Sequence, residues 1–157
     1  MIKVSQIYNA VDGTRQEFEI TFPAGVFDIK EISGPVTARG YIMRVDEGVM
    51  MLVNELEATQ LTPCALCGKE LKRKLNFMPS EWLFYEKKPL KEDDENESLT
   101  LDRTRMEIDP FSPIRQDIIL NIDYAPRCTK PCKHYEEAED GIKALAGLKD
   151  LFKKGKK

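Results

Sequence analysis

The sequence has little histidine and lacks the motifs that hydrolytic and nucleotide-binding enzymes commonly use. Its 157 residues include a single histidine, His134, and a single tryptophan, Trp82. The H-E-x-x-H, G-x-S-x-G and P-loop patterns do not occur. Acidic runs are present at 92–97 and 136–140, but such runs are far more often solvated faces than catalytic pairs. We therefore expect a protein that is not an enzyme and that has no small-molecule substrate.

The sequence also has no long apolar run. Its first residues, MIKVSQIYNAVDG, do not combine a basic region with an apolar stretch, as a secretory signal would. No segment approaches the roughly 18 apolar residues that a membrane-spanning helix needs. Hydrophobic residues make up 41% and charged residues 32%, which indicates a modest core and a well-solvated surface. We expect one cytoplasmic domain, residues 1–157, that does not bind membranes.

Cysteine is scarce, but the four cysteines form two close pairs. Cys64 and Cys67 lie in LTPCALCGKE, and Cys128 and Cys132 lie in PRCTKPCKHY. In a reducing cytoplasm, such pairs favour metal binding or thiol chemistry over structural disulfides. Four thiolates complete a tetrahedral structural zinc site, and each short spacing lets one turn supply two ligands. Because roughly sixty residues separate the pairs, the zinc would link two remote segments.

Other interpretations of the cysteines stay open. They could be free thiols, or Cys64 and Cys67 could form a redox disulfide. A thioredoxin-like site is disfavoured because Cys64 follows a hairpin pattern instead of opening a helix after a parallel strand. His134 could replace one cysteine as a ligand, although four thiolates already complete the shell, and iron suits the same ligands as zinc.

The pattern of apolar residues predicts mostly strands in the first half of the chain. VSQIY and EFEITF alternate apolar and polar residues, and residues 36–61 predict a hairpin around a turn at 46–48. The alternation shifts along both hairpin strands, which predicts a bulge or a change of register. Residues 72–86 predict further extended structure, divided at Pro79.

The second half predicts loops and helices. We expect a disordered acidic loop at 87–98, a strand or loop at 99–110, a helix over 113–121 that Ser112 and Pro113 begin, and a terminal helix within 136–157. The whole pattern predicts an α+β fold, with a mainly antiparallel β-sheet, two C-terminal helices and a cysteine-clasped zinc site.

The net charge of −3 conceals a basic set of residues. KELKRKL follows the first cysteine pair, more cations surround the second pair, and residues 153–157 form a basic tail. A lysine-rich end is often only solvated, but such tails also bind phosphate backbones. A zinc ion that joins the two cysteine pairs would gather the cations of 69–75 with Arg127, Lys130 and Lys133 into one basic patch, which could bind RNA. The predicted RNA-binding residues are Lys69, Lys72, Arg73, Lys74, Arg127, Lys130, Lys133, Lys153, Lys154, Lys156 and Lys157.

The order of these motifs resembles the YceD family, the large ribosomal RNA subunit accumulation proteins of bacteria and plastids. The resemblance covers nearly the full chain. It includes GTRQEFEITF, SGPVTARGYIMRV, ELEATQLTPCALCGKEL, IDPFSPIRQDIILNIDYAPRC and ALAGLKDLFKK. All four cysteines match the family's cysteine positions, whereas KHYEEAED stands where many members have further cysteines.

The resemblance implies an accessory role in the accumulation of large-subunit ribosomal RNA. The implied partners are ribosomal RNA, a large-subunit ribosomal protein, or both, and the resemblance brings no catalytic residues. Two alternatives remain: a thiol redox protein that uses the C-x-x-C pair, and a protein-binding module whose acidic loop engages a basic ribosomal protein.

Overall fold

A computed structural model describes residues 1–87, 99–128 and 132. The chain forms two compact units. Among the described residues, the first contains Met1–Gln60 and Arg73–Ile122, and the second contains Leu61–Lys72, residues 123–128 and Cys132. The predicted terminal helix, the basic tail and almost all of the predicted acidic loop lie outside the described residues. In the part of the chain that is described, no helix is long and apolar enough to cross a membrane.

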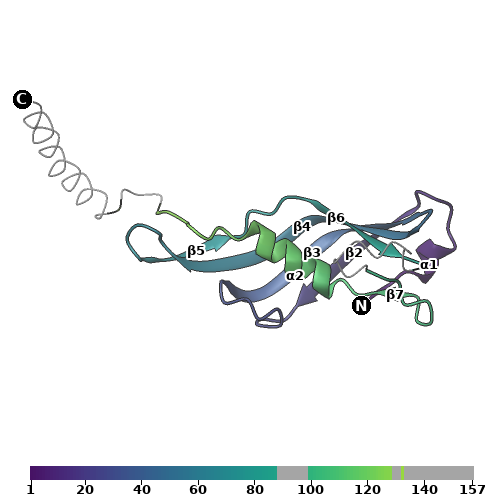
Figure 1. Ribbon diagram of the computed structural model, residues 1–157, viewed down its shortest axis with the longest axis horizontal. Helices are drawn as coiled ribbons and strands as arrows, with labels where there is room; N and C mark the ends of the chain where they lie inside the picture. The colour runs from purple at the N-terminus through teal and green to yellow at the C-terminus, as the bar shows by residue number, and fades with distance from the viewer. Residues whose placement is uncertain (88–98, 129–131, 133–157) are drawn as a thin grey trace, which may run out of the picture. The chain divides into compact units, whose positions relative to one another are not determined.

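An antiparallel β-sheet dominates the described structure (Figure 1). Strands β2 (Arg15–Phe22), β3 (Ile32–Val45), β4 (Gly48–Pro63) and β5 (Glu70–Lys74) are neighbours in that order, and β6 (Ser80–Tyr85) also pairs with β4. The pairings β2–β3, β3–β4 and β4–β6 are antiparallel. A separate two-stranded sheet joins β1 (Ile2–Lys3) to β7 (Glu107–Ile108). The prediction of a mainly antiparallel sheet is confirmed.

The predicted hairpin is present, and so is the predicted irregularity. Strand β3 ends at Val45 and β4 begins at Gly48, with the turn between them. Arg39 pairs with Glu55 but Gly40 pairs with Val53, so Asn54 is an extra residue in β4. The close approach of the strands requires glycine here, because a Cβ atom on Gly40 would lie 1.9 Å from the carbonyl oxygen of Leu52.

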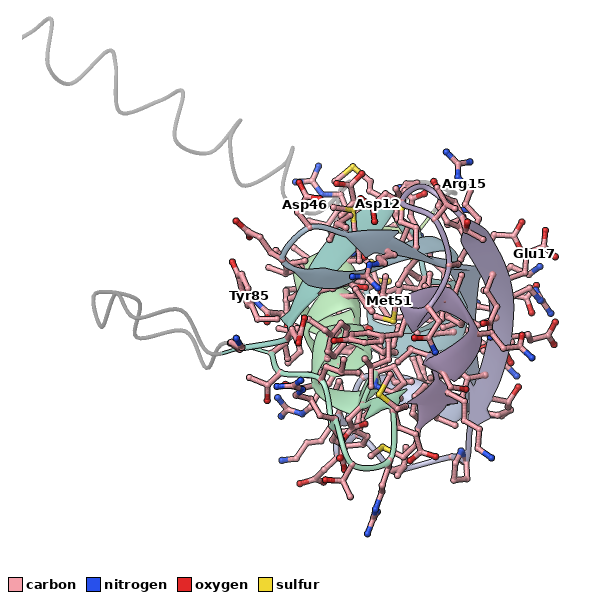
Figure 2. All side chains as sticks on the ribbon, turned by 90° about the vertical axis from the view of Figure 1, so that its right-hand side faces the viewer. Asp12, Arg15, Glu17, Asp46, Met51 and Tyr85 are labelled. Atoms are coloured by element: carbon pink, nitrogen blue, oxygen red, sulfur yellow. The ribbon has the colours of Figure 1, made fainter. Side chains whose placement is uncertain are left out.

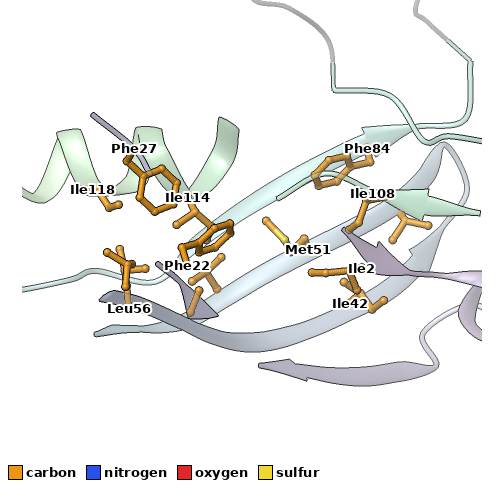
Figure 3. Close-up of a cluster of buried hydrophobic side chains, with 14 of the residues drawn as sticks. Ile2, Phe22, Phe27, Ile42, Met51, Leu56, Phe84, Ile108, Ile114 and Ile118 are labelled. Atoms are coloured by element: carbon orange, nitrogen blue, oxygen red, sulfur yellow. The ribbon is translucent and has the colours of Figure 1, made fainter. Parts of the chain in front are cut away.

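Helix α2 (Phe111–Asn121) packs against the sheet and completes the core (Figure 3). Ile114 and Ile118 are fully buried, and the ring of Phe27 lies 4.8 Å from that of Phe22. The helix begins two residues before the predicted start. Since the carboxylate of Asp109 accepts a hydrogen bond from the backbone N–H of Phe111 at 3.0 Å, the chain is already turned before Ser112.

The prediction of a strand over VSQIY is wrong. Ser5–Tyr8 form a short helix, α1, and the N–H of Tyr8 donates to the carbonyl of Val4. Val4 and Ile7 are both buried, and their spacing of three residues suits a helix better than a strand. The burial of these two side chains therefore outweighs the local alternation.

Candidate metal centre

The first cysteine pair lies in the connection between β4 and β5. The backbone N–H of Cys64 donates to the carbonyl of Lys69 at 2.8 Å, and the N–H of Gly68 donates to the carbonyl of Cys64 at 2.9 Å. Gly68 has a φ of 69°, a left-handed conformation that glycine adopts without steric cost. These bonds close a tight loop, residues 64–69, which we call the cysteine knuckle.

Cys128 and Cys132 of the second pair follow α2 and lie outside the helices and strands. The backbone N–H of Ala65, inside the cysteine knuckle, donates to the carbonyl of Pro126 at 2.8 Å. Arg127 and Cys128 come directly after this contact. The hydrogen bond therefore fixes the second segment against the first, although the chain between them contains β5, β6 and α2.

The four sulfur atoms form a cluster with the dimensions of a tetrahedral metal site. All four lie within 4.8 Å of one another. The sulfurs of Cys64 and Cys132 are 3.7 Å apart, and those of Cys67 and Cys128 are 3.5 Å apart. A tetrahedron with zinc–sulfur bonds of about 2.3 Å has sulfur–sulfur edges of about 3.8 Å, whereas a disulfide needs about 2.05 Å. The cysteines are free of disulfides and fit a metal ion.

The cluster is partly shielded from solvent. Cys64 is 3% exposed and Cys132 is 7% exposed, while Cys67 and Cys128 are half-buried. Burial of four thiolates without a counter-charge would be costly, and a divalent cation would offset this cost. The partial burial of the cluster is consistent with a site that can hold a metal ion.

Hydrogen bonds and burial give Cys64, Cys128 and Cys132 different pKa values. The backbone N–H groups of Cys67 and Leu66 favour the Cys64 thiolate and lower the pKa of Cys64 to about 5. The neighbouring sulfurs, Cys67 first, raise the pKa of Cys128 to about 12. Burial is the main reason that the pKa of Cys132 is also raised. Without a metal the cluster would hold a thiolate at Cys64 and thiols at Cys128 and Cys132.

The predicted cations fall into three groups. Lys69, Lys72 and Arg127 belong to the same compact unit as the cysteines, and both lysines are exposed. Arg73 and Lys74, at the end of β5, belong to the other unit. The remaining predicted cations lie outside the described residues, as does His134: Lys130, Lys133, Lys153, Lys154, Lys156 and Lys157.

The first unit contains a buried carboxylate that the sequence motifs do not identify. Asp117 on α2 is 2% exposed, and one of its oxygens accepts hydrogen bonds from Ser80 Oγ at 2.7 Å and Trp82 Nε1 at 3.2 Å. Its spacing from Ile114 and Ile118 places it on the apolar face of the predicted helix. A polar residue on an otherwise apolar helix face is the one feature of the sequence that could have drawn attention to Asp117. The local sequence does not reveal its hydrogen-bond partners on β6.

Comparison of this chain with protein-family models, with curated proteins and with solved structures finds no match. The function of the protein is therefore inferred from its residues and their geometry.

Proposed function

We propose that this protein is a non-enzymatic accessory factor in assembly of the large ribosomal subunit. It supports accumulation of large-subunit ribosomal RNA, and it contacts that RNA or a ribosomal protein from the unit that contains the cysteines. The observation that supports this most is the four-cysteine cluster, which joins two cation-bearing segments remote in sequence. The order of the sequence motifs supplies the ribosomal context.

We propose zinc as the ion of this cluster, in a structural role. Closed four-cysteine sites are typical of structural zinc, whereas catalytic zinc sites keep a position open for water or substrate. Cys64, Cys67, Cys128 and Cys132 would hold the ion. Zinc would neutralise the thiolates and would hold the second segment on the cysteine knuckle more firmly than the contact from Ala65 to Pro126 alone.

The cations near the cluster supply a surface for phosphate groups. The backbone carbonyl of Lys69 accepts the hydrogen bond that closes the cysteine knuckle. Arg127 directly follows Pro126, whose carbonyl accepts a hydrogen bond from the knuckle. Their backbones are thus fixed by the same contacts that place the cysteines. Cations on a fixed backbone bind phosphates with release of counterions, so this binding should weaken as salt rises.

Filter binding tests the RNA contact. Zinc-loaded protein is titrated with large-subunit ribosomal RNA fragments over a salt series, beside a variant that combines Lys69→Glu and Lys72→Glu. Lys30→Glu, an exposed lysine of the first unit, is the control. We expect the double variant to bind more weakly and to lower the salt slope by about 0.9 for each phosphate that it no longer neutralises. The control should bind like the wild type.

Sedimentation of cell extracts tests the assembly role separately. The protein should co-sediment with precursors of the large subunit, and its removal should lower the amount of large-subunit ribosomal RNA. Salt-insensitive or absent RNA binding, together with no association with these particles, would contradict the proposal.

A thiol redox function is the second candidate, and the pKa of Cys64 favours it. A thiolate at neutral pH is the reactive form of cysteine. Against it, Cys64 is almost fully buried, whereas redox-active cysteines are partly exposed. A reduction potential near that of cytosolic glutathione, for a Cys64–Cys67 disulfide, would support this candidate over the structural zinc site.

A further inference from the structure

The first unit has a sheet face that points away from its core. Along β4, Val49, Met51 and Val53 are buried in the core. Successive side chains of a strand point to opposite faces, so Met50 and Leu52 point outward. Figure 2 shows Arg15 and Glu17 of β2 on this outward side, while Met51 lies toward the interior. We call this surface of β2, β3, β4 and β6 the outer face.

The outer face has an apolar patch that crosses neighbouring strands. Tyr41 pairs with Leu52, and Met43 pairs with Met50, which pairs in turn with Leu83 of β6. All five side chains are half-buried by their neighbours. Two of them are methionines, whose flexible side chains suit them to binding surfaces.

The bulge in β4 opens a hollow beside this patch. The extra residue Asn54 and the next residue, Glu55, are both exposed, because the bulge interrupts the alternation. The hollow has a volume of about 400 Å³, and its lining includes Glu17, Arg39 and Tyr41. Bulges are common where a strand must redirect side chains for function. Here the bulge adds a polar side chain and a depression to the sheet surface.

Carboxylates surround the patch and the hollow. Arg39 makes ion pairs with Glu19 at 3.0 Å, with Glu57 at 3.2 Å and with Glu55 at 3.4 Å. Each of these glutamates is about 60% exposed or more, so each keeps room for a second cation. The charged side chains of the outer face are Arg15, Glu17, Glu19, Arg39, Glu55, Glu57 and Glu81.

We propose that the outer face is a docking surface for a protein segment rich in lysine or arginine that also has apolar anchors. The apolar side chains of the segment would cover the patch around Leu52 and Met50, and its cations would pair with Glu17, Glu19, Glu55 and Glu57. This inference concerns only the first unit and does not depend on the metal centre or on the proposed ribosomal role.

The charges of the outer face argue against two other occupants. Five glutamates outnumber the two arginines and Lys74 of β5, which lines a hollow together with Glu57, so the face as a whole would repel the phosphates of a nucleic acid. A symmetric pair of copies would place the same surface against itself, and the glutamates of both copies would then repel one another. A basic segment relieves this repulsion and gains the apolar contact as well.

The test measures binding of a 14-residue amphipathic peptide made only of leucine and lysine. Its controls are a peptide of the same composition without the amphipathic order, and a peptide with glutamate in place of every lysine. One protein variant combines Glu19→Gln with Glu55→Gln, which keeps an oxygen for Arg39. A second combines Met50→Ser with Leu52→Ser. The matched control, Asp46→Asn with Glu47→Gln, removes two exposed charges at the β3–β4 turn. Circular dichroism and thermal unfolding confirm that each variant is folded.

We expect the amphipathic lysine peptide to bind, and both control peptides to bind at least tenfold more weakly. The glutamine variant, Glu19→Gln with Glu55→Gln, should bind the peptide about threefold or more weakly, because each exposed charge pair contributes modestly. The serine variant, Met50→Ser with Leu52→Ser, should bind it about tenfold more weakly, as removal of central apolar contacts does. The turn variant, Asp46→Asn with Glu47→Gln, should bind it like the wild type.

Three results would overturn the proposal. The first is equal binding of the peptide to the wild type and to both outer-face variants, or no binding at all. The second is a dimer in analytical ultracentrifugation that the serine variant dissociates, because the occupant would then be a second copy. The third is an RNA oligonucleotide that competes with the peptide for the wild type and fails to bind the serine variant.

Discussion

The sulfur atoms of Cys64 and Cys132 lie 3.7 Å apart, although 68 positions separate the two residues in the sequence. Between them the chain forms β5, β6, β7 and α2. A contact of this kind closes a long loop, so its formation has a considerable entropic cost. A metal ion bound by both pairs would offset that cost, because metal affinity becomes folding free energy when the unfolded chain has no site.

Each cysteine should be required for tight zinc binding. We expect Cys64→Ser to lower zinc affinity by more than about 100-fold, since loss of a direct ligand should cost more than loss of an outer hydrogen bond. Competition with a chelator of known affinity measures the change. Leu66→Ser is the control, because Leu66 lies in the same cysteine knuckle and is 38% exposed. Equal affinities in the two variants would show that Cys64 is not a ligand.

Zinc binding should release protons at pH 7. The pKa values of Cys128 and Cys132 are raised, so both are thiols before the metal binds, whereas Cys64 with a pKa of about 5 is already a thiolate. Affinity should therefore fall as the pH falls. Titration calorimetry in two buffers of different ionisation enthalpy counts the protons. Identical heats in both buffers would contradict the expected state of Cys128 and Cys132.

The stability of the metal-free protein should depend on pH through Cys64. The pKa of the Cys64 thiol falls from an ordinary 9.0 to about 5 on folding. The folded state therefore binds fewer protons than the unfolded state between these values, and this group adds stability as the pH rises from 5 to 9. Denaturant unfolding of the chelated protein measures the trend. Cys64→Ser should flatten it, and an unchanged pH dependence in that variant would refute the assignment.

The buried carboxylate of Asp117 should be replaceable by an amide but not by a methyl group. Asp117→Ala removes the carboxylate that accepts from Ser80 Oγ and Trp82 Nε1, although Trp82 keeps Ser80 Oγ at 3.1 Å as an acceptor, and we expect a loss of about 2 kcal/mol in the free energy of unfolding. Asp117→Asn keeps an oxygen for both donors. Urea unfolding followed by Trp82 fluorescence compares the two variants.

The same residue predicts a pH effect. Burial raises the pKa of Asp117, so its ionisation opposes folding, and the stability that its protonated form provides is lost as the pH rises through the folded pKa. The amide of Asp117→Asn cannot ionise, so the free energy of unfolding of this variant should match or exceed that of the wild type at pH 7. Equal destabilisation by asparagine and alanine would show that the hydrogen bonds to β6 are not the reason for the burial of Asp117.

Gly40 should tolerate no side chain. We expect Gly40→Ala to lower the free energy of unfolding by about 3 kcal/mol, because the new Cβ would collide with the backbone oxygen of Leu52. Gly25→Ala is the matched control: its Cβ would meet nothing within 4 Å, and its φ of 78° costs only about 1 kcal/mol. Thermal unfolding of both variants gives the comparison. Equal losses would mean that the strands beside the bulge separate readily.

Much of this fold could be predicted because its signals are local. The alternation around residues 36–61 predicted the β3–β4 hairpin, and the shift in that alternation predicted the bulge, because one extra residue exchanges the two faces of a strand. The spacing within each cysteine pair predicted two ligand-bearing turns. Zinc requires four ligands, so both cysteine pairs were expected to lie close together. The distances between the four sulfur atoms confirm that they do.

The features that were missed depend on burial, on a side-chain hydrogen bond at the start of a helix, or on contacts between distant residues. The helix at Ser5–Tyr8 exists because Val4 and Ile7 are buried, which a window of five residues does not reveal. The early start of α2 depends on Asp109, and the pairing of β6 with β4 depends on the order of strands in space. The outer face combines residues from four strands, so no single motif in the sequence indicates it.

Metal content measured together with thiol reactivity tests the central claim most directly. Untagged protein purified under reducing conditions is analysed by plasma mass spectrometry, and its thiols are titrated before and after chelation. We predict about one zinc per chain, with four thiols that react only after the metal leaves. Protein without metal, whose four thiols react freely from the start, would contradict the metal centre.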